Sequence, residues 1–193
     1  MMIWDEILTS TKEMDMSRLW QLLDAETRTL AANSFYRHDF EDGGARHLQA
    51  DAMVAAALNF RLVAARKLPA ERRARSIALL PRPTPELVGM ILIALHFENR
   101  RGLMSRFLDS LGIEHEDGLI PPDHGALLAD DSRLAEAIDD LFGSFPPDQV
   151  ELYLAALYLG DGESWGSIRS AMAQRKARFA EHQTGLADEG NVR

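Results

Sequence analysis

Cysteine is absent from this 193-residue sequence, so a disulfide framework, a thiolate metal site and a cysteine nucleophile are all excluded. Only histidine, aspartate, glutamate and water remain as ligands for a metal ion. Long apolar runs are missing as well: the longest nearly apolar run, residues 87–97, contains 11 residues, whereas about 20 are needed to cross a bilayer. Residues 1–16 have neither the basic start nor the continuous apolar stretch of an export signal. We therefore expect a cytoplasmic protein that does not associate with membranes.

Residues that favour strands are also scarce. Val, Ile and Thr together occupy 20 positions, whereas Leu and Ala occupy 53, and this balance favours helix over strand. With 46% hydrophobic and 26% charged residues, the chain can bury a sizeable core. We predict an all-α fold: a single domain over residues 1–183, built from about seven to eight helices as an irregular bundle or a short stack of antiparallel helix pairs. Residues 184–193 are expected to form a frayed tail, and the acidic loop 113–128 is the best candidate for a weak domain boundary.

Apolar periodicity and helix-ending residues place the individual helices. Apolar side chains recur at i, i+3, i+4 and i+7 within each segment, and proline and glycine separate the segments. Thr84 can cap a helix that Pro85 opens, and Gly112 is expected to close another. The expected helices cover approximately residues 17–34, 45–68, 70–80, 85–97, 103–111, 131–142 and 147–159, with a last helix ending near residue 183.

Charge is distributed unevenly along the chain. The net charge of -9 repels polyanions on average, so a nucleic-acid partner is not expected. Residues 60–106, however, contain ten Arg or Lys and three Glu, and residues 107–140 contain ten acids and one Arg. Both stretches are explained by solvated helix faces that neutralise one another. The alternative is a basic face kept for an anionic partner, with Arg72, Arg73 and Arg75 as its candidate contacts.

A weak internal similarity concerns the segments 57–60, 94–97 and 156–159, which read Ala-Leu-Asn-Phe, Ala-Leu-His-Phe and Ala-Leu-Tyr-Leu. Their spacings are 37 and 62 residues, and the first falls within the range of two-helix repeats. Coincidence is the favoured explanation in a chain so rich in Ala and Leu. If the similarity is a repeat, Asn59, His96 and Tyr158 occupy equivalent helix positions and line one polar groove.

The adjacent residues His38 and Asp39 form a His-Asp pair in a chain expected to be all-α. This pair resembles that of the HD-type metal-dependent phosphohydrolases, in which it joins an upstream histidine and a downstream aspartate around a divalent ion. The resemblance implies His38 and Asp39 as metal ligands. No histidine precedes residue 38, however, so one ligand position of that family is empty. The alternative is a polar loop between helices with a capping aspartate.

A second group of metal-ligating residue types comprises His115, Glu116 and His124. Histidine and carboxylate suit zinc, manganese or iron(II), and a loop can fold several ligands onto one ion. The spacings match no H-E-x-x-H, H-x-H or calcium-loop pattern, so a hydrated acidic loop explains these residues as well.

Two further catalytic or binding signatures fail. Residues 162–166 match the G-x-S-x-G nucleophile elbow, but an elbow needs a preceding strand and a downstream acid and histidine. Here a helical segment precedes the motif, and the one downstream histidine, His182, lies on the same expected helix. Glycine-rich phosphate loops are absent.

Our leading hypothesis is therefore a non-enzymatic helical domain that binds another protein or a second copy of itself, without a cofactor. The candidate contacts are those named above: Asn59, Arg72, Arg73, Arg75, His96 and Tyr158. The alternative is a metal-dependent hydrolase in which a metal-bound water attacks the substrate, with the candidate ligands His38, Asp39, His115, Glu116 and His124.

Overall fold

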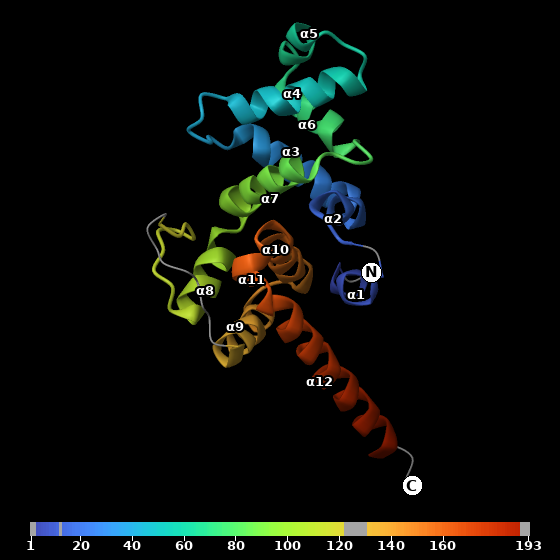
Figure 1. Cartoon of the computed structure of the whole chain (residues 1–193), viewed down its shortest axis with the longest axis vertical. Coiled ribbons are helices and arrows are strands. Elements are labelled where there is room, and N and C mark those ends of the chain that lie inside the picture. Colours follow the sequence, from blue (N-terminus) through green and yellow to red (C-terminus); the bar gives the residue numbers. More distant parts are fainter. Residues whose placement is uncertain (1–2, 12, 122–130, 190–193) are drawn as a thin grey trace. The chain divides into compact units, whose positions relative to one another are not determined.

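The computed structural model of the chain describes residues 3–11, 13–121 and 131–189, with side chains as far as residue 180. Within these ranges the chain is helical, and its one β-type pairing is an isolated bridge between Glu116 and Leu119. The predicted all-α class is confirmed (Figure 1). The helices are α1 (Ile3–Thr9), α2 (Met16–Leu22), α3 (Ala25–Arg37), α4 (Ala45–Ala57), α5 (Leu62–Arg66), α6 (Ala70–Ala78), α7 (Pro85–Asn99), α8 (Arg101–Leu111), α9 (Asp131–Ser144), α10 (Pro147–Gly160), α11 (Gly162–Trp165) and α12 (Ser167–Glu189).

These helices outnumber the seven to eight expected, because two expected long helices are each broken and two short helices, α1 and α11, are additional. The helix expected over 17–34 is interrupted before Asp24, whose carboxylate accepts a hydrogen bond from the Thr27 N–H at 2.6 Å and so begins α3. The helix expected over 45–68 ends at Ala57. There Asn59 adopts a left-handed conformation with φ 54°, and the Phe60 N–H donates to the Ala55 carbonyl at 2.8 Å, as in a Schellman motif. The short helices α1 and α11 were not predicted.

Other helix ends agree with the sequence. Thr84 accepts a hydrogen bond from the Leu87 N–H, and Pro85 opens α7. Gly112 ends α8 with φ 68°, and the Ile113 N–H donates to the Leu108 carbonyl at 2.9 Å.

The chain divides into two compact units: unit 1 comprises residues 1–11 and 105–193, and unit 2 comprises residues 12–104. The division falls after Met104, within α8, and not in the acidic loop 113–128. The expectation of a single domain stays a prediction. Each unit is described by itself below.

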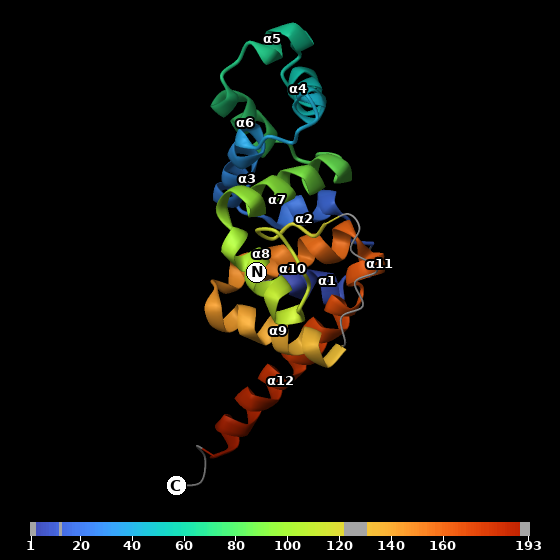
Figure 2. The same cartoon turned by 90° about the vertical axis from the view of Figure 1, so that its left-hand side faces the viewer.

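Unit 2 is organised around α3, which packs against α6 and α7. α2 packs on α7, and α4 packs on both α5 and α6. The α6–α7 connection is tied to α2, since the Trp20 indole N–H donates to the Leu80 carbonyl and the Ser17 hydroxyl to the Pro83 carbonyl. Figures 1 and 2 both show α5 at the end of unit 2 opposite α2. The largest side chains of its core are those of Leu19, Trp20, Phe35, Ile77, Leu87, Ile91, Leu92, Leu95 and Leu103.

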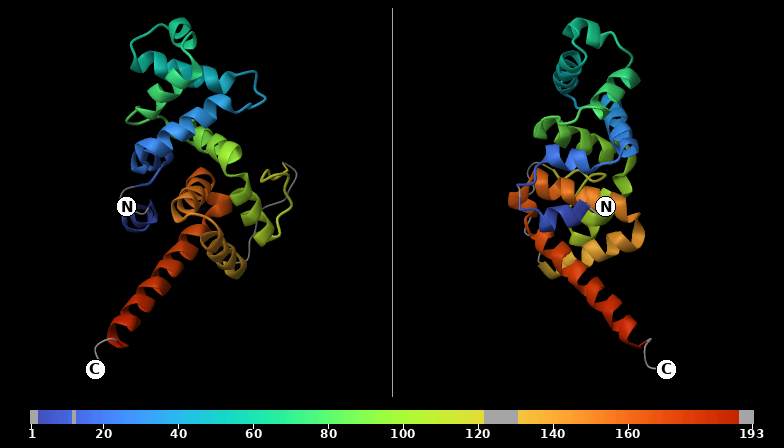
Figure 3. Two further views of the ribbon diagram at one scale, coloured as in Figure 1. Left: turned by 180° about the vertical axis from the view of Figure 1, so that it is seen from behind. Right: turned by 90° about the vertical axis from the view of Figure 1, so that its right-hand side faces the viewer.

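Unit 1 is organised around α10, an apolar helix that contacts α1, α9, α11 and α12. The first half of α12 packs against α9, whereas its second half extends away from the other helices of the unit (Figure 3). Phe107 contacts the rings of Tyr153 and Trp165. Trp165 belongs to the segment 162–166, which contains α11 instead of a strand-to-helix turn. Its side chain is buried in this core.

No helix in the described ranges has the length and apolar content that a bilayer span needs.

Candidate functional site

The His38–Asp39 pair is engaged in structural contacts within unit 2. The His38 Nδ1 atom lies 2.8 Å from Glu98 Oε1, and its ring stacks on Phe97 at 5.6 Å between centroids. The Asp39 carboxylate instead accepts a hydrogen bond from the Glu41 N–H at 3.0 Å, within its own loop. These two side chains therefore have different partners. His38 links the end of α3 to α7, and Asp39 stabilises the turn that follows.

The second candidate group lies in unit 1 and is also occupied by local bonds. The His115 Nδ1 atom accepts a hydrogen bond from the Gly118 N–H at 3.1 Å, and its Nε2 lies 3.2 Å from Asp109 Oδ1. The backbone of Glu116 pairs with Leu119, and His124 lies outside the described residues. Among the residues described, no three His, Asp or Glu side chains lie close enough together to hold a metal ion.

The three residues of the internal similarity do not share a helix position. Asn59 follows the end of α4 in a left-handed turn that only a few residue types tolerate. His96 lies in the last turn of α7 and is 3% exposed, and burial lowers the pKa of its imidazole to about 3. Tyr158 is half-buried on α10 in unit 1, with its ring 5.9 Å from that of Trp4.

Arg73 is held in a buried polar cluster of unit 2. Its guanidinium donates to both carboxylate oxygens of Asp51, at 2.8 and 2.7 Å, and lies over the Tyr36 ring at 4.5 Å. The Tyr36 hydroxyl donates to the same carboxylate at 2.9 Å. Burial, together with the Asp51 charge, raises the pKa of Tyr36. Asp51 is only 2% exposed, so the charge of Arg73 is compensated within the fold.

Arg72 and Arg75 are exposed on α6, close in sequence to an exposed apolar segment. Leu58, Phe60, Leu62 and Val63 are all exposed, Phe60 by 45% and Val63 by 67%. α5 is a single turn whose one buried residue is Ala65, so its large side chains project outward. We call residues 58–67 the tip of unit 2. The tip also contains the exposed basic residues Arg61, Arg66 and Lys67.

The basic groups of this region lack acidic partners. Arg61, Arg66, Lys67, Arg72 and Arg75 form no ion pair with any residue that the structure describes. Between residues 58 and 75 the chain carries one acid, Glu71. The tip and its neighbouring α6 therefore combine uncovered apolar area with uncompensated positive charge.

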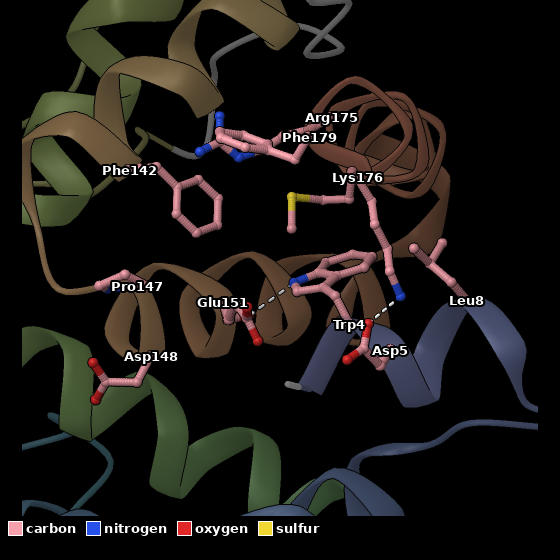
Figure 4. A pocket seen from close by; sticks show the side chains of 11 residues that line it. Trp4, Asp5, Leu8, Phe142, Pro147, Asp148, Glu151, Arg175, Lys176 and Phe179 are labelled. Carbon is pink, nitrogen blue, oxygen red and sulfur yellow. Dashed lines mark hydrogen bonds and ion pairs between the residues drawn. The ribbon is translucent and has the colours of Figure 1, made fainter. Parts of the chain in front are cut away.

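Unit 1 contains a pocket of about 630 Å³ between α1, α9, α10 and α12 (Figure 4). Its walls are apolar and aromatic, and charged side chains border them. The lining residues are Trp4, Asp5, Leu8, Phe142, Pro147, Asp148, Glu151, Met172, Arg175, Lys176 and Phe179.

One wall of the pocket is fixed by Glu151 of α10, which anchors α1. Its carboxylate accepts a hydrogen bond from the Ile3 N–H at 2.9 Å, and its carbonyl accepts one from the Trp4 indole N–H at 3.1 Å. Burial raises the pKa of the Glu151 carboxyl, and the backbone N–H groups of Ile3 and Trp4 oppose this shift. The dashed lines in Figure 4 show the Trp4 bond and the Lys176–Asp5 ion pair, which joins α12 to α1.

The opposite wall is formed by Arg175 of α12. Its guanidinium lies 4.1 Å from the centroid of Phe142 and 4.6 Å from that of Phe179, and it forms an ion pair with Asp139. Burial lowers the pKa of Arg175. Asp148, in contrast, is exposed at the pocket border and forms no ion pair within the described ranges.

The pocket residues were not singled out from the sequence. The available signal was the spacing of Trp4 with Leu8 and of Met172 with Arg175 and Phe179, which places each set on one helix face. The arrangement offers apolar binding and charge pairing. Comparisons of the chain with family models, with curated proteins and with solved structures found no match.

Proposed function

We propose that this protein is a non-enzymatic interaction domain that docks its unit 2 tip onto an apolar, acidic surface of a partner protein. The observation that supports the proposal is the exposure of four large apolar side chains within residues 58–63, next to basic groups that lack ion-pair partners.

The chemistry of the tip favours a protein over a nucleic acid. Burying apolar surface contributes about 25 cal/mol per Å², and a partner that covers Phe60 and Val63 gains this contribution. Phosphate contacts need only the basic groups and leave the aliphatic side chains uncovered. A partner surface with both apolar and acidic groups satisfies all of the exposed side chains.

Catalysis finds no comparable support. His38 and Asp39 are bonded to different partners, and both ring nitrogens of His115 are engaged. These contacts do not favour the alternative of a metal-dependent hydrolase.

Photocrosslinking tests the proposal at the position of contact. A photoreactive amino acid replaces Val63 in one variant and Glu26, an exposed residue of α3, in the control. We expect a defined adduct from position 63 that disappears at high salt, and none from position 26. Equal labelling at both positions, or no adduct at position 63, would contradict the proposal.

A further inference from the structure

We propose that the partner is a second copy of this chain, and that the tip of one copy docks into the unit 1 pocket of the next. This inference depends on the proposed function and names its partner. It joins two otherwise separate observations: an exposed apolar tip and a pocket with apolar walls, on the same polypeptide.

The apolar groups of the two surfaces are complementary. The pocket volume of about 630 Å³ lies within the ~300–1,000 Å³ of ordinary binding sites and suits a few large side chains. Phe60 and Val63 are three residues apart and are the most exposed apolar side chains of the tip. The aromatic walls formed by Trp4 and Phe142 favour contact with a ring such as that of Phe60.

The charges are complementary as well. The tip contains three basic residues and no acid, whereas unit 1 contains 19 acidic and 7 basic residues. At the pocket border, Lys176 is paired with Asp5, and Arg175 and Arg178 share the Asp139 carboxylate. Asp148 is left without an ion pair in the described residues, so it is available to a basic group of the tip. Unit 1 as a whole attracts a positively charged segment over a longer range.

The two surfaces belong to different parts of the chain, so the contact is heterologous. A dimer joined by one such contact presents one free tip and one free pocket, to which further copies can add. The inference therefore predicts assemblies that grow with protein concentration and shorten at high salt.

The test uses two variants, each of which lacks one surface. The tip variant carries Phe60→Asp and Val63→Asp, and the pocket variant carries Leu8→Lys and Asp148→Lys. Leu30→Asp, at an exposed apolar residue of α3, is the control. All are studied as full chains by sedimentation velocity from micromolar to submillimolar concentration.

We expect the wild type and the Leu30→Asp control to assemble, and each surface variant to remain monomeric. An equimolar mixture of the two surface variants should form a 1:1 heterodimer and nothing larger, because each variant retains the surface that the other lacks. The heterodimer also shows that both variants are folded.

A wild type that stays monomeric at every concentration would overturn this inference. So would a tip variant that assembles like the wild type, or a mixture without heterodimer. If the wild type is monomeric and position 63 still crosslinks to a different protein, the second-copy partner is wrong and the proposed function stands. If neither assembly nor an adduct is found, both are wrong.

Discussion

At the residue scale, Asp51 is the most consequential polar side chain of unit 2. It lies in the middle of helix α4, is nearly inaccessible to solvent, and receives hydrogen bonds from Arg73 and Tyr36. A buried charge of this kind is tolerated because its partners are present. The same contact compensates the charge of Arg73, whereas Arg72 and Arg75 are exposed and have no ion pair in the described residues.

Replacing Asp51 by Ala should lower the free energy of unfolding by about 3 kcal/mol, because the partly buried Arg73 guanidinium loses its counter-charge. Urea unfolding followed by circular dichroism measures the change. Asp148→Ala serves as the control, since that exposed carboxylate has no ion pair among the described residues and its loss should cost less than about 0.5 kcal/mol. Equal effects of the two substitutions would argue against a stabilising role for Asp51.

His96 makes stability depend on pH. Burial lowers its pKa from 6.5 to about 3, so the folded protein keeps the imidazole neutral while the unfolded chain binds a proton below pH 6.5. The contribution of His96 is therefore complete above pH 6.5 and is lost as pH falls toward 3, by up to about 1.4 kcal/mol per pH unit. His96→Leu should flatten this part of the stability profile, measured by urea unfolding between pH 7 and 4. An unchanged slope would show that His96 does not cause the dependence.

At the scale of elements, α1 depends on its attachment to α10. α1 has seven residues, too few for a helix to be stable alone in water. Its first N–H groups are held by Glu151, and its Asp5 is paired with Lys176. The pocket wall that contains Trp4 therefore exists because α10 and α12 fix it.

Glu151→Leu should loosen α1, because the Ile3 N–H loses its acceptor, at a cost of about 1–3 kcal/mol. Glu151→Gln retains an amide oxygen as acceptor and should change little. Amide hydrogen exchange over residues 3–9 reads the effect, with α6 in unit 2 as an internal reference. Identical exchange in the two variants would mean that the carboxylate does not anchor α1.

Sequence patterns predicted the helices whose ends are set by local chemistry. Thr84 with Pro85, and Gly112, act through their own backbone neighbours, so their roles could be deduced without tertiary information. The break at Asn59 was missed, because asparagine is only sometimes left-handed and the apolar pattern continues through it. The role of Trp4 was missed for another reason: its partners on α10 are nearly 150 residues away in the sequence, and their proximity depends on tertiary packing.

At the scale of the whole molecule, the charges of the two units differ in sign. Residues 12–104 contain 14 basic and 11 acidic residues, and the remainder contains 7 and 19. The overall acidity that argues against nucleic-acid binding is therefore a property of unit 1 alone. The residues of the proposed site were only partly predictable, since the basic residues of this region are evident in the sequence, whereas the exposure of the apolar side chains beside them is evident only in the structure.

The charges of the tip should affect the association rate constant, and its apolar contacts should affect the dissociation rate constant. The binding reaction is that between the tip variant and the pocket variant, in which the pocket variant supplies the intact tip. Adding Arg61→Glu and Arg66→Glu to the pocket variant should lower the association rate constant about tenfold at low salt and less at high salt. Val63→Ala in the same protein should mainly raise the dissociation rate constant. Biosensor kinetics at two salt concentrations separates them. A charge reversal that alters only dissociation would exclude electrostatic attraction as the cause.

The position of Trp4 gives the pocket a built-in optical signal. The chain has three tryptophans, all of them buried. Trp4 is the one that lines the pocket, whereas Trp20 and Trp165 are not among its lining residues. The fluorescence of Trp4 therefore responds to whatever enters the pocket, against a constant background from the other two. Unlabelled protein can thus report its own occupancy during a titration.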